Sequence, residues 1–159
     1  RRLLTDYCMT EHHALQRQTC EQPIAVASFH MDSHHCRRIV LNGRVVNEGD
    51  IQIPVKPFAI DVRALLPKIQ QCSNLIVTVC ISASHIAYGS IRMEPIFMML
   101  GQVAGRLAAL AIEQQSAVQH VAYAQLKQQL LEQGHVVEWD MSINDDPISR
   151  MEETFGGSI

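Results

Sequence analysis

The sequence predicts an α/β fold, or α+β if the chain is considered as an isolated fragment. Two neighbouring segments carry this prediction. Residues 75–79 form an apolar run rich in β-branched side chains, which is typical of a strand covered on both faces in a parallel sheet. From Pro95 to about Gln114 the sequence is apolar on nearly all sides, which indicates a buried helix. A strand, a connection and a helix in this order form the unit from which parallel sheets are built.

The first 72 residues are expected to contain the end of a helix and several short strands. Residues 1–20 carry apolar side chains at helical spacing and would finish an amphipathic helix that begins upstream. Strands are expected at 24–30, 39–41, 44–46, 51–55 and 57–62. The second and third of these form a hairpin, because Asn42 and Gly43 between them tolerate positive φ.

After residue 72 the sequence predicts mainly helix. A polar connection of small residues at 80–94 separates the 75–79 strand from the long helix, and Pro95 suits the first turn of that helix. Tyr123, Leu126 and Leu130 mark a second, amphipathic helix that Gly134 would end. Residues 140–159 show no periodicity and are expected to form a mobile tail or an extension that docks elsewhere.

The composition fits one globular domain and disfavours several kinds of partner. Of the 159 residues, 47% are hydrophobic and 18% are charged, and the formal net charge is −3. Lysine and arginine are scattered, so we expect no nucleic-acid partner. The apolar segment 96–112 contains Gln102 and Arg106 and is shorter than the roughly 20 residues that span a bilayer, so we expect no membrane span. The five cysteines form no CxxC pair and are expected to be reduced.

The connection at 80–94 is a candidate ligand site. Ligands of open parallel sheets bind beyond the carboxyl ends of the strands, where a helix N-terminus offers free N–H groups and about half a positive charge. An anion could therefore bind between the 75–79 strand and the helix that starts at Pro95. The alternative is an ordinary connection between a strand and a helix.

Several blocks of the sequence resemble the FAD-dependent oxidoreductase family of the glutathione-reductase-like superfamily. The principal blocks are YCMTE at 7–11, MDSH at 31–34, VNEG at 46–49, Arg63 with PK at 67–68, CISASH at 80–85, GSIRMEP at 89–95 and LGQVAG at 100–105. They occur in the family's order, and the resemblance covers roughly residues 1–139. It implies that this chain is the C-terminal portion of such an enzyme.

The resemblance divides the chain into two parts. Residues 73–139 would be the C-terminal part of an FAD-binding, Rossmann-like domain, and residues 1–72 would supply strands of a mixed or antiparallel substrate-domain sheet. The family's opening motif, GxGxxG, is missing, because none of the eight glycines falls in a GxG arrangement. We therefore expect the N-terminal FAD-binding part of the same protein to be the partner of this chain. FAD would bind the intact protein and not this chain alone.

The start of the sequence favours a piece of a longer protein. It has no initial Met and no leader-like stretch. Any targeting signal would then lie upstream, so both a cytoplasmic and an exported location stay open.

The resemblance also supplies candidate site residues. Those expected near the flavin are Ser82, Ser84, His85, Gly89, Arg92, Met93, Pro95 and Met98. Arg92 would be a cation beside the N1–C2=O edge of the flavin, which is negatively charged after reduction, unless it pairs with Glu94. Asp32, His34 and His85 are candidates for proton transfer to or orientation of a small organic substrate, because imidazole gains and loses protons near neutrality. His85 and the two serines could instead cap or satisfy their own loop.

Two other classes of function stay open. The chain could be a catalytically silent binding or scaffolding domain derived from such an enzyme. It could also be a small metal-dependent hydrolase that uses the cluster His30, His34, His35 and Cys36. A metal site is not expected, because His34 and His35 would point to opposite faces of a strand and no second cluster with zinc-like spacing follows.

Overall fold

A computed structural model describes residues 1–139 of the chain, and the segment expected to form a tail, 140–159, lies outside the described residues. The elements in chain order are α1 (Glu11–Ala14), β1 (Pro23–Ala27), β2 (Met31–Ser33), β3 (Arg37–Leu41), β4 (Arg44–Glu48), β5 (Ile51–Ile53), β6 (Phe58–Asp61), the 3-10 helix η1 (Val62–Leu65), α2 (His85–Ile91), α3 (Glu94–Glu113), the 3-10 helix η2 (Val118–His120) and α4 (Tyr123–Glu132). This mixture of helices and small antiparallel sheets confirms the predicted fold class for a fragment.

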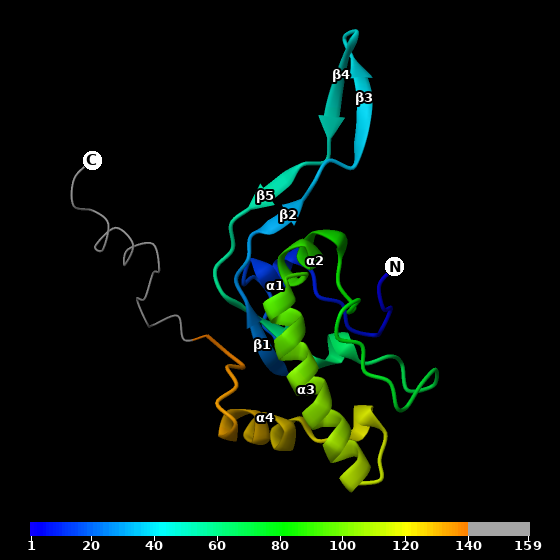
Figure 1. Ribbon diagram of the computed structural model, residues 1–159, viewed down its shortest axis with the longest axis vertical. Coiled ribbons are helices and arrows are strands. Elements are labelled where there is room, and N and C mark those ends of the chain that lie inside the picture. Colours follow the sequence, from blue (N-terminus) through cyan, green and yellow to red (C-terminus); the bar gives the residue numbers. More distant parts are fainter. Residues whose placement is uncertain (140–159) are drawn as a thin grey trace, which may run out of the picture.

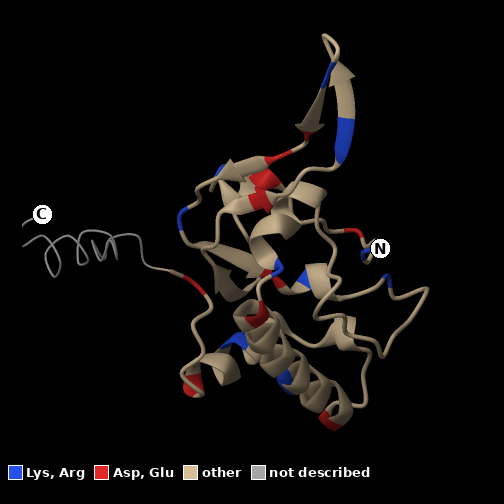
Figure 2. Cartoon of the chain, turned by 45° about the horizontal axis from the view of Figure 1, so that its top comes forward, with Lys and Arg blue, Asp and Glu red and all other residues tan. Residues whose placement is uncertain are grey.

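The strands form three antiparallel pairs, β1 with β6, β2 with β5 and β3 with β4. The last two pairs follow one another along residues 31–53 and make one long ribbon, which projects from the body of the molecule (Figure 1). The predicted hairpin at its tip is confirmed, with φ of +51° at Asn42 and +76° at Gly43. Acidic and basic residues are spread over both the ribbon and the body (Figure 2).

The core lies between α3 and the β1–β6 pair. Helix α3 runs beside β1, and α4 crosses near its far end (Figure 1). The buried face of α3 consists of Ile96, Leu100, Val103, Leu107 and Leu110, together with Ala111. Their spacing of three and four residues places them along one side of the helix.

The opposite face of α3 is exposed, although the sequence predicted a helix buried on nearly all sides. Met98 and Ile112 are each about three-quarters exposed, at 75% and 76%. By length and composition alone α3 could also cross a membrane, a test that the core helices of many globular proteins pass; 33% of its most apolar stretch is buried.

Helix α4 confirms the second predicted helix. It buries Leu126 and Leu130 and is followed by Gly134 with φ of +73°, the left-handed conformation expected just beyond a helix end.

The prediction of a helix within residues 1–20 is wrong apart from the single turn of α1. Residues 3–9 form no helix and lie beside 80–84. The N–H of Leu3 donates to the carbonyl of Cys80 (2.7 Å), and the N–H of Met9 donates to that of Ser82 (3.0 Å). Met9 and Ala83 form an isolated parallel bridge. The backbone of this segment is thus satisfied by a distant part of the chain, which the local spacing of apolar residues could not indicate.

The prediction of a strand at 75–79 is also wrong for the described structure. Leu75 and Val79 are 46% and 51% exposed, and the segment joins no strand pair. Only Val77 among these residues bonds through its N–H to a distant carbonyl, that of Leu65 (2.9 Å). A central parallel strand needs a neighbour on each side, and residues 1–139 supply neither.

The polar connection expected at 80–94 contains helix α2. Ser84 caps this helix, since its side-chain oxygen accepts the N–H of Ala87 at 3.2 Å. A serine three residues before a free backbone donor is an ordinary helix-start signal, and it was present in the sequence.

Candidate functional site

Helix α2 approaches strand β2 through a glycine. Gly89 is buried, and a Cβ at this position would lie 2.3 Å from the carbonyl oxygen of Asp32. Only glycine permits so close an approach of two backbones. The next residue, Ser90, donates its hydroxyl hydrogen bond to the carbonyl of Phe29. These two contacts fix the end of α2 beside Asp32.

Five polar side chains from α2, β2 and their flanks meet at this contact, and we call them the Asp32 cluster: Asp32, Ser33, His34, His85 and Arg92. Nη2 of Arg92 lies 2.5 Å from Oδ2 of Asp32, and Nε2 of His34 lies 3.1 Å from the same oxygen. The hydroxyl of Ser33 is 3.0 Å from Nε2 of His85. Asp32 is only 8% exposed, so its charge is compensated mainly by Arg92 and not by water.

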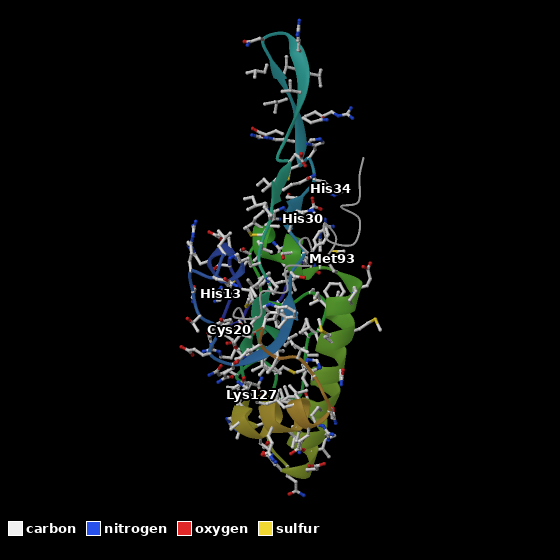
Figure 3. The ribbon with its side chains drawn as sticks, turned by 90° about the vertical axis from the view of Figure 1, so that its left-hand side faces the viewer. His13, Cys20, His30, His34, Met93 and Lys127 are labelled. Atoms are coloured by element: carbon white, nitrogen blue, oxygen red, sulfur yellow. The ribbon has the colours of Figure 1, made fainter. Side chains whose placement is uncertain are left out.

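A cavity of about 370 Å³ opens beside this cluster, and we call it the Asp32 cavity. Its lining consists of the five cluster residues and of Arg2, Cys36, Tyr88 and Gly89. The volume lies within the range of roughly 300 to 1,000 Å³ that is usual for small-molecule sites. Figure 3 shows His30 and His34 where the ribbon leaves the body, near Met93 at the start of α3. The cavity is therefore placed at the junction of the ribbon and the helices.

The predicted site residues divide into two groups. Of those expected near the flavin, His85, Gly89 and Arg92 line the Asp32 cavity. The expected substrate-side residues Asp32 and His34 line the same cavity. Arg92 pairs with Asp32, and no ion pair with Glu94 is formed. Residues predicted separately on the substrate side and on the flavin side are thus brought together around one cavity.

The other predicted flavin contacts do not line this cavity. Ser84 uses its hydroxyl to cap α2, which is the local role that the sequence left open. Ser82 is buried, and its backbone bonds with Ala64 and Met9. Met93 precedes α3, Pro95 lies in the first turn of that helix, and Met98 points to solvent.

The first turn of α3 offers little to an anion. Pro95 has no N–H, and the N–H groups of Ile96 and Phe97 donate to the carbonyl of Met93 at 3.0 and 3.1 Å. Glu94 adds a negative charge at the same end. Among the described residues, the Asp32 cavity offers a cation, Arg92, that would suit the polar edge of a flavin ring. Residues 1–139 contain no glycine-rich cradle for its diphosphate.

A second polar network, which the sequence did not predict, surrounds Asp61. This carboxylate is fully buried and binds the guanidinium group of Arg63 through Nε (2.8 Å) and Nη2 (2.7 Å). It also accepts the N–H of Gln22 at 3.0 Å. Burial alone would raise the pKa of Asp61, but the hydrogen bonds from Arg63 and Gln22 outweigh it, and the pKa is lowered. The sequence did contain a signal for this pair, because an acidic and a basic residue, Asp61 and Arg63, stand two positions apart.

Tyr7 and His13 extend this network towards the N-terminus. The Arg63 guanidinium group lies 4.2 Å above the ring of Tyr7, whose hydroxyl is 2.9 Å from Nε2 of His13. The N–H of Thr10 donates to Nδ1 of His13 at 3.0 Å, so the ring proton is on Nε2 and points to Tyr7. Burial raises the pKa of Tyr7 and lowers that of His13. These neutral side chains pack α1 against β6, and their role is structural.

Histidine and cysteine side chains near the ribbon do not assemble a metal centre. Nε2 of His30 is 4.0 Å from Oδ1 of Asp32, and His34 contacts the other oxygen. Within residues 1–139, no group of three or more His, Cys, Asp or Glu side chains has a geometry that could hold a metal ion.

Comparison with known proteins identifies the family. The family described as FAD dependent oxidoreductase matches residues 1–130, a stretch that includes the whole Asp32 cluster. The chain therefore belongs to the FAD-dependent oxidoreductase family, and its resemblance to that family is confirmed. Neither the curated proteins nor the solved structures yielded a match.

Proposed function

We propose that this chain is the C-terminal portion of an FAD-dependent oxidoreductase of the glutathione-reductase-like superfamily, and that the Asp32 cavity is part of its substrate site. One observation carries the proposal. Two family-like blocks of sequence, MDSH at 31–34 and the segment from His85 to Arg92, supply opposite sides of one cavity. Their polar side chains are in contact there, although they are 50 to 60 residues apart in the chain.

In this proposal the histidines move protons and the remaining residues orient them. His34 donates from Nε2 to Asp32, which fixes its ring and leaves Nδ1 to face a substrate. A hydrogen bond between the Ser33 hydroxyl and Nε2 holds the ring of His85. FAD, when bound to the intact protein, would supply hydride or electron-pair transfer. The side chains of this chain would bind and orient the substrate and carry the accompanying proton.

Arg92 would have two partners in the intact protein. One is Asp32, and the other is the polar edge of the flavin ring, because Nε and Nη1 of Arg92 have no acceptor among residues 1–139. Ser82, Ser84, Met93, Pro95 and Met98 would lie around the same region of the cofactor. The N-terminal FAD-binding part of the same protein would complete the site, so the isolated chain should be colourless and inactive.

The silent-domain alternative keeps support from one observation, the lack of a diphosphate cradle in residues 1–139. It predicts that extending the protein towards its N-terminus adds no flavin binding. The oxidoreductase proposal predicts a yellow protein with one FAD per chain.

The test is a redox titration of the protein extended by the residues encoded upstream of Arg1, with dithionite as the reductant. Arg92→Gln should lower the midpoint potential of the flavin by roughly 30 mV, which corresponds to about 1.4 kcal/mol for a two-electron couple, because reduced flavin loses a cation. Arg106→Gln, on α3 and outside the cavity, is the matched control and should change nothing. Failure of the extended protein to bind FAD would refute the proposal. If the midpoint potential of the flavin does not change in Arg92→Gln, the Asp32 cavity does not lie beside the flavin.

A further inference from the structure

The charges that line the Asp32 cavity do not balance. Two guanidinium groups, those of Arg2 and Arg92, face one carboxylate, that of Asp32. Arg92 gives only Nη2 to Asp32. In the described part of the chain, Arg2 has no carboxylate within ion-pair distance. The carboxylate and the two guanidinium groups together leave the cavity lining with one net positive charge.

Tyr88 holds Arg2 at the cavity, whereas Arg92 is held there by Asp32. Its hydroxyl donates to the carbonyl of Val79 at 3.0 Å, which fixes the ring, and the guanidinium carbon of Arg2 lies 5.2 Å from the ring centroid. Burial raises the pKa of Tyr88, while the charges of Arg2 and Arg92 act in the opposite direction. Both guanidinium groups thus act on the same phenol, although Arg2 and Arg92 are far apart in sequence.

The remaining lining groups suit a small ligand with one anionic end. A guanidinium group presents parallel N–H donors that match the two oxygens of a carboxylate. Ser33, His34 and His85 add hydrogen-bonding groups on the ribbon side.

A larger cavity of about 480 Å³ elsewhere in the chain offers a contrast. There Arg63 is already bound by Asp61 and Lys68 by Asp6 at 2.6 Å, so its cations are compensated.

We propose that the Asp32 cavity binds a small organic monoanion, a carboxylate, and that Arg2 and Arg92 are its charge-recognising residues. This inference rests on the proposed function, since it names the substrate class of that site. A single net positive charge matches a carboxylate better than a phosphate monoester, which carries nearly two negative charges at neutral pH.

The experiment uses the full 159-residue chain and three probes of similar shape: benzoate, phenyl phosphate and the uncharged benzamide. Binding is followed by calorimetry and by the NMR signals of the histidine rings. Benzoate should bind at least tenfold more tightly than benzamide and should shift the ring signals of His34 and His85. Arg2→Gln and Arg92→Gln should each weaken benzoate binding about tenfold, and Lys68→Gln at the larger cavity should leave it unchanged.

Arg2→Gln keeps the test decisive even if Arg92→Gln does not fold, because within residues 1–139 the Arg2 side chain contacts the Tyr88 ring and forms no ion pair. Equal binding of benzoate and benzamide, or benzoate binding that neither variant weakens, would overturn the proposal. Tighter binding of phenyl phosphate would overturn the choice of a carboxylate. These measurements contain no flavin, so their failure can be told apart from a failure of the redox titration.

Discussion

Replacing Gly89 by alanine tests the contact that builds the site. The added Cβ would lie 2.3 Å from the carbonyl oxygen of Asp32, about 1 Å inside the usual contact distance. The oxygen belongs to the backbone and the position of a Cβ is fixed by the backbone, so no side-chain rotation can relieve the clash. Overpacking of this kind costs typically 1–3 kcal/mol, and the upper end applies where backbone must move. Alanine recovers up to about 1 kcal/mol of helix propensity within α2. We therefore expect a net loss of about 2 kcal/mol in the free energy of unfolding.

The matched control is Gly105→Ala, on the exposed face of α3. A Cβ there meets nothing within 4 Å, so only helix propensity should act and the chain should gain about 0.5–1 kcal/mol. Urea unfolding of both variants and of the parent, followed by far-UV circular dichroism, measures the two changes. The difference between the variants is the cost of the clash, about 3 kcal/mol. If Gly89→Ala proves as stable as Gly105→Ala, α2 and β2 do not approach each other as described.

Three further outcomes are expected for the full chain. Asp61→Asn weakens the buried site that binds Arg63 and should cost about 2–3 kcal/mol in urea unfolding; a loss below about 0.5 kcal/mol would contradict the network's structural role. Because burial lowers the pKa of His13, the unfolded chain binds a proton that the folded chain resists, so stability should fall as the pH drops below about 6.5, and His13→Gln should flatten this dependence. Gly43→Val, at a φ of +76°, should cost about 1–2 kcal/mol and speed amide exchange in the hairpin while leaving α3 protected.

Local signals predicted the elements that depend on local structure. The hairpin follows from Asn42-Gly43, and the end of α4 follows from Gly134. A tight turn and a helix end each need a positive φ, and these residue types adopt it readily, so the signal is local in sequence. The 75–79 segment shows the opposite case. Its pattern describes a strand with partners on both sides, and such a pattern forms a strand only where those partners are present.

The sequence named candidate site residues but could not indicate their geometry. Asp32, His34, His85 and Arg92 were all proposed from the family-like blocks, yet no pattern along the chain indicated that Arg92 pairs with Asp32. Gly89 was expected to contact the cofactor, and the structure gives it a packing role against β2. Distances between residues some 60 positions apart depend on tertiary packing, which single-sequence patterns do not contain.

The site joins two segments that lie far apart in this chain. Asp32 and His34 belong to the ribbon segment, whereas His85 and Arg92 flank a helix in the other. Neither segment alone compensates its charges, because Asp32 would be a buried carboxylate without Arg92. Docking of α2 on β2 brings Arg92 to Asp32, which offsets the cost of burying this carboxylate, and Gly89 makes the docking sterically possible. Arg92, which recognises the substrate in our proposal, therefore also joins the two segments, so substitutions of Arg92 should alter stability and ligand binding in parallel, whereas Arg2→Gln should alter ligand binding alone.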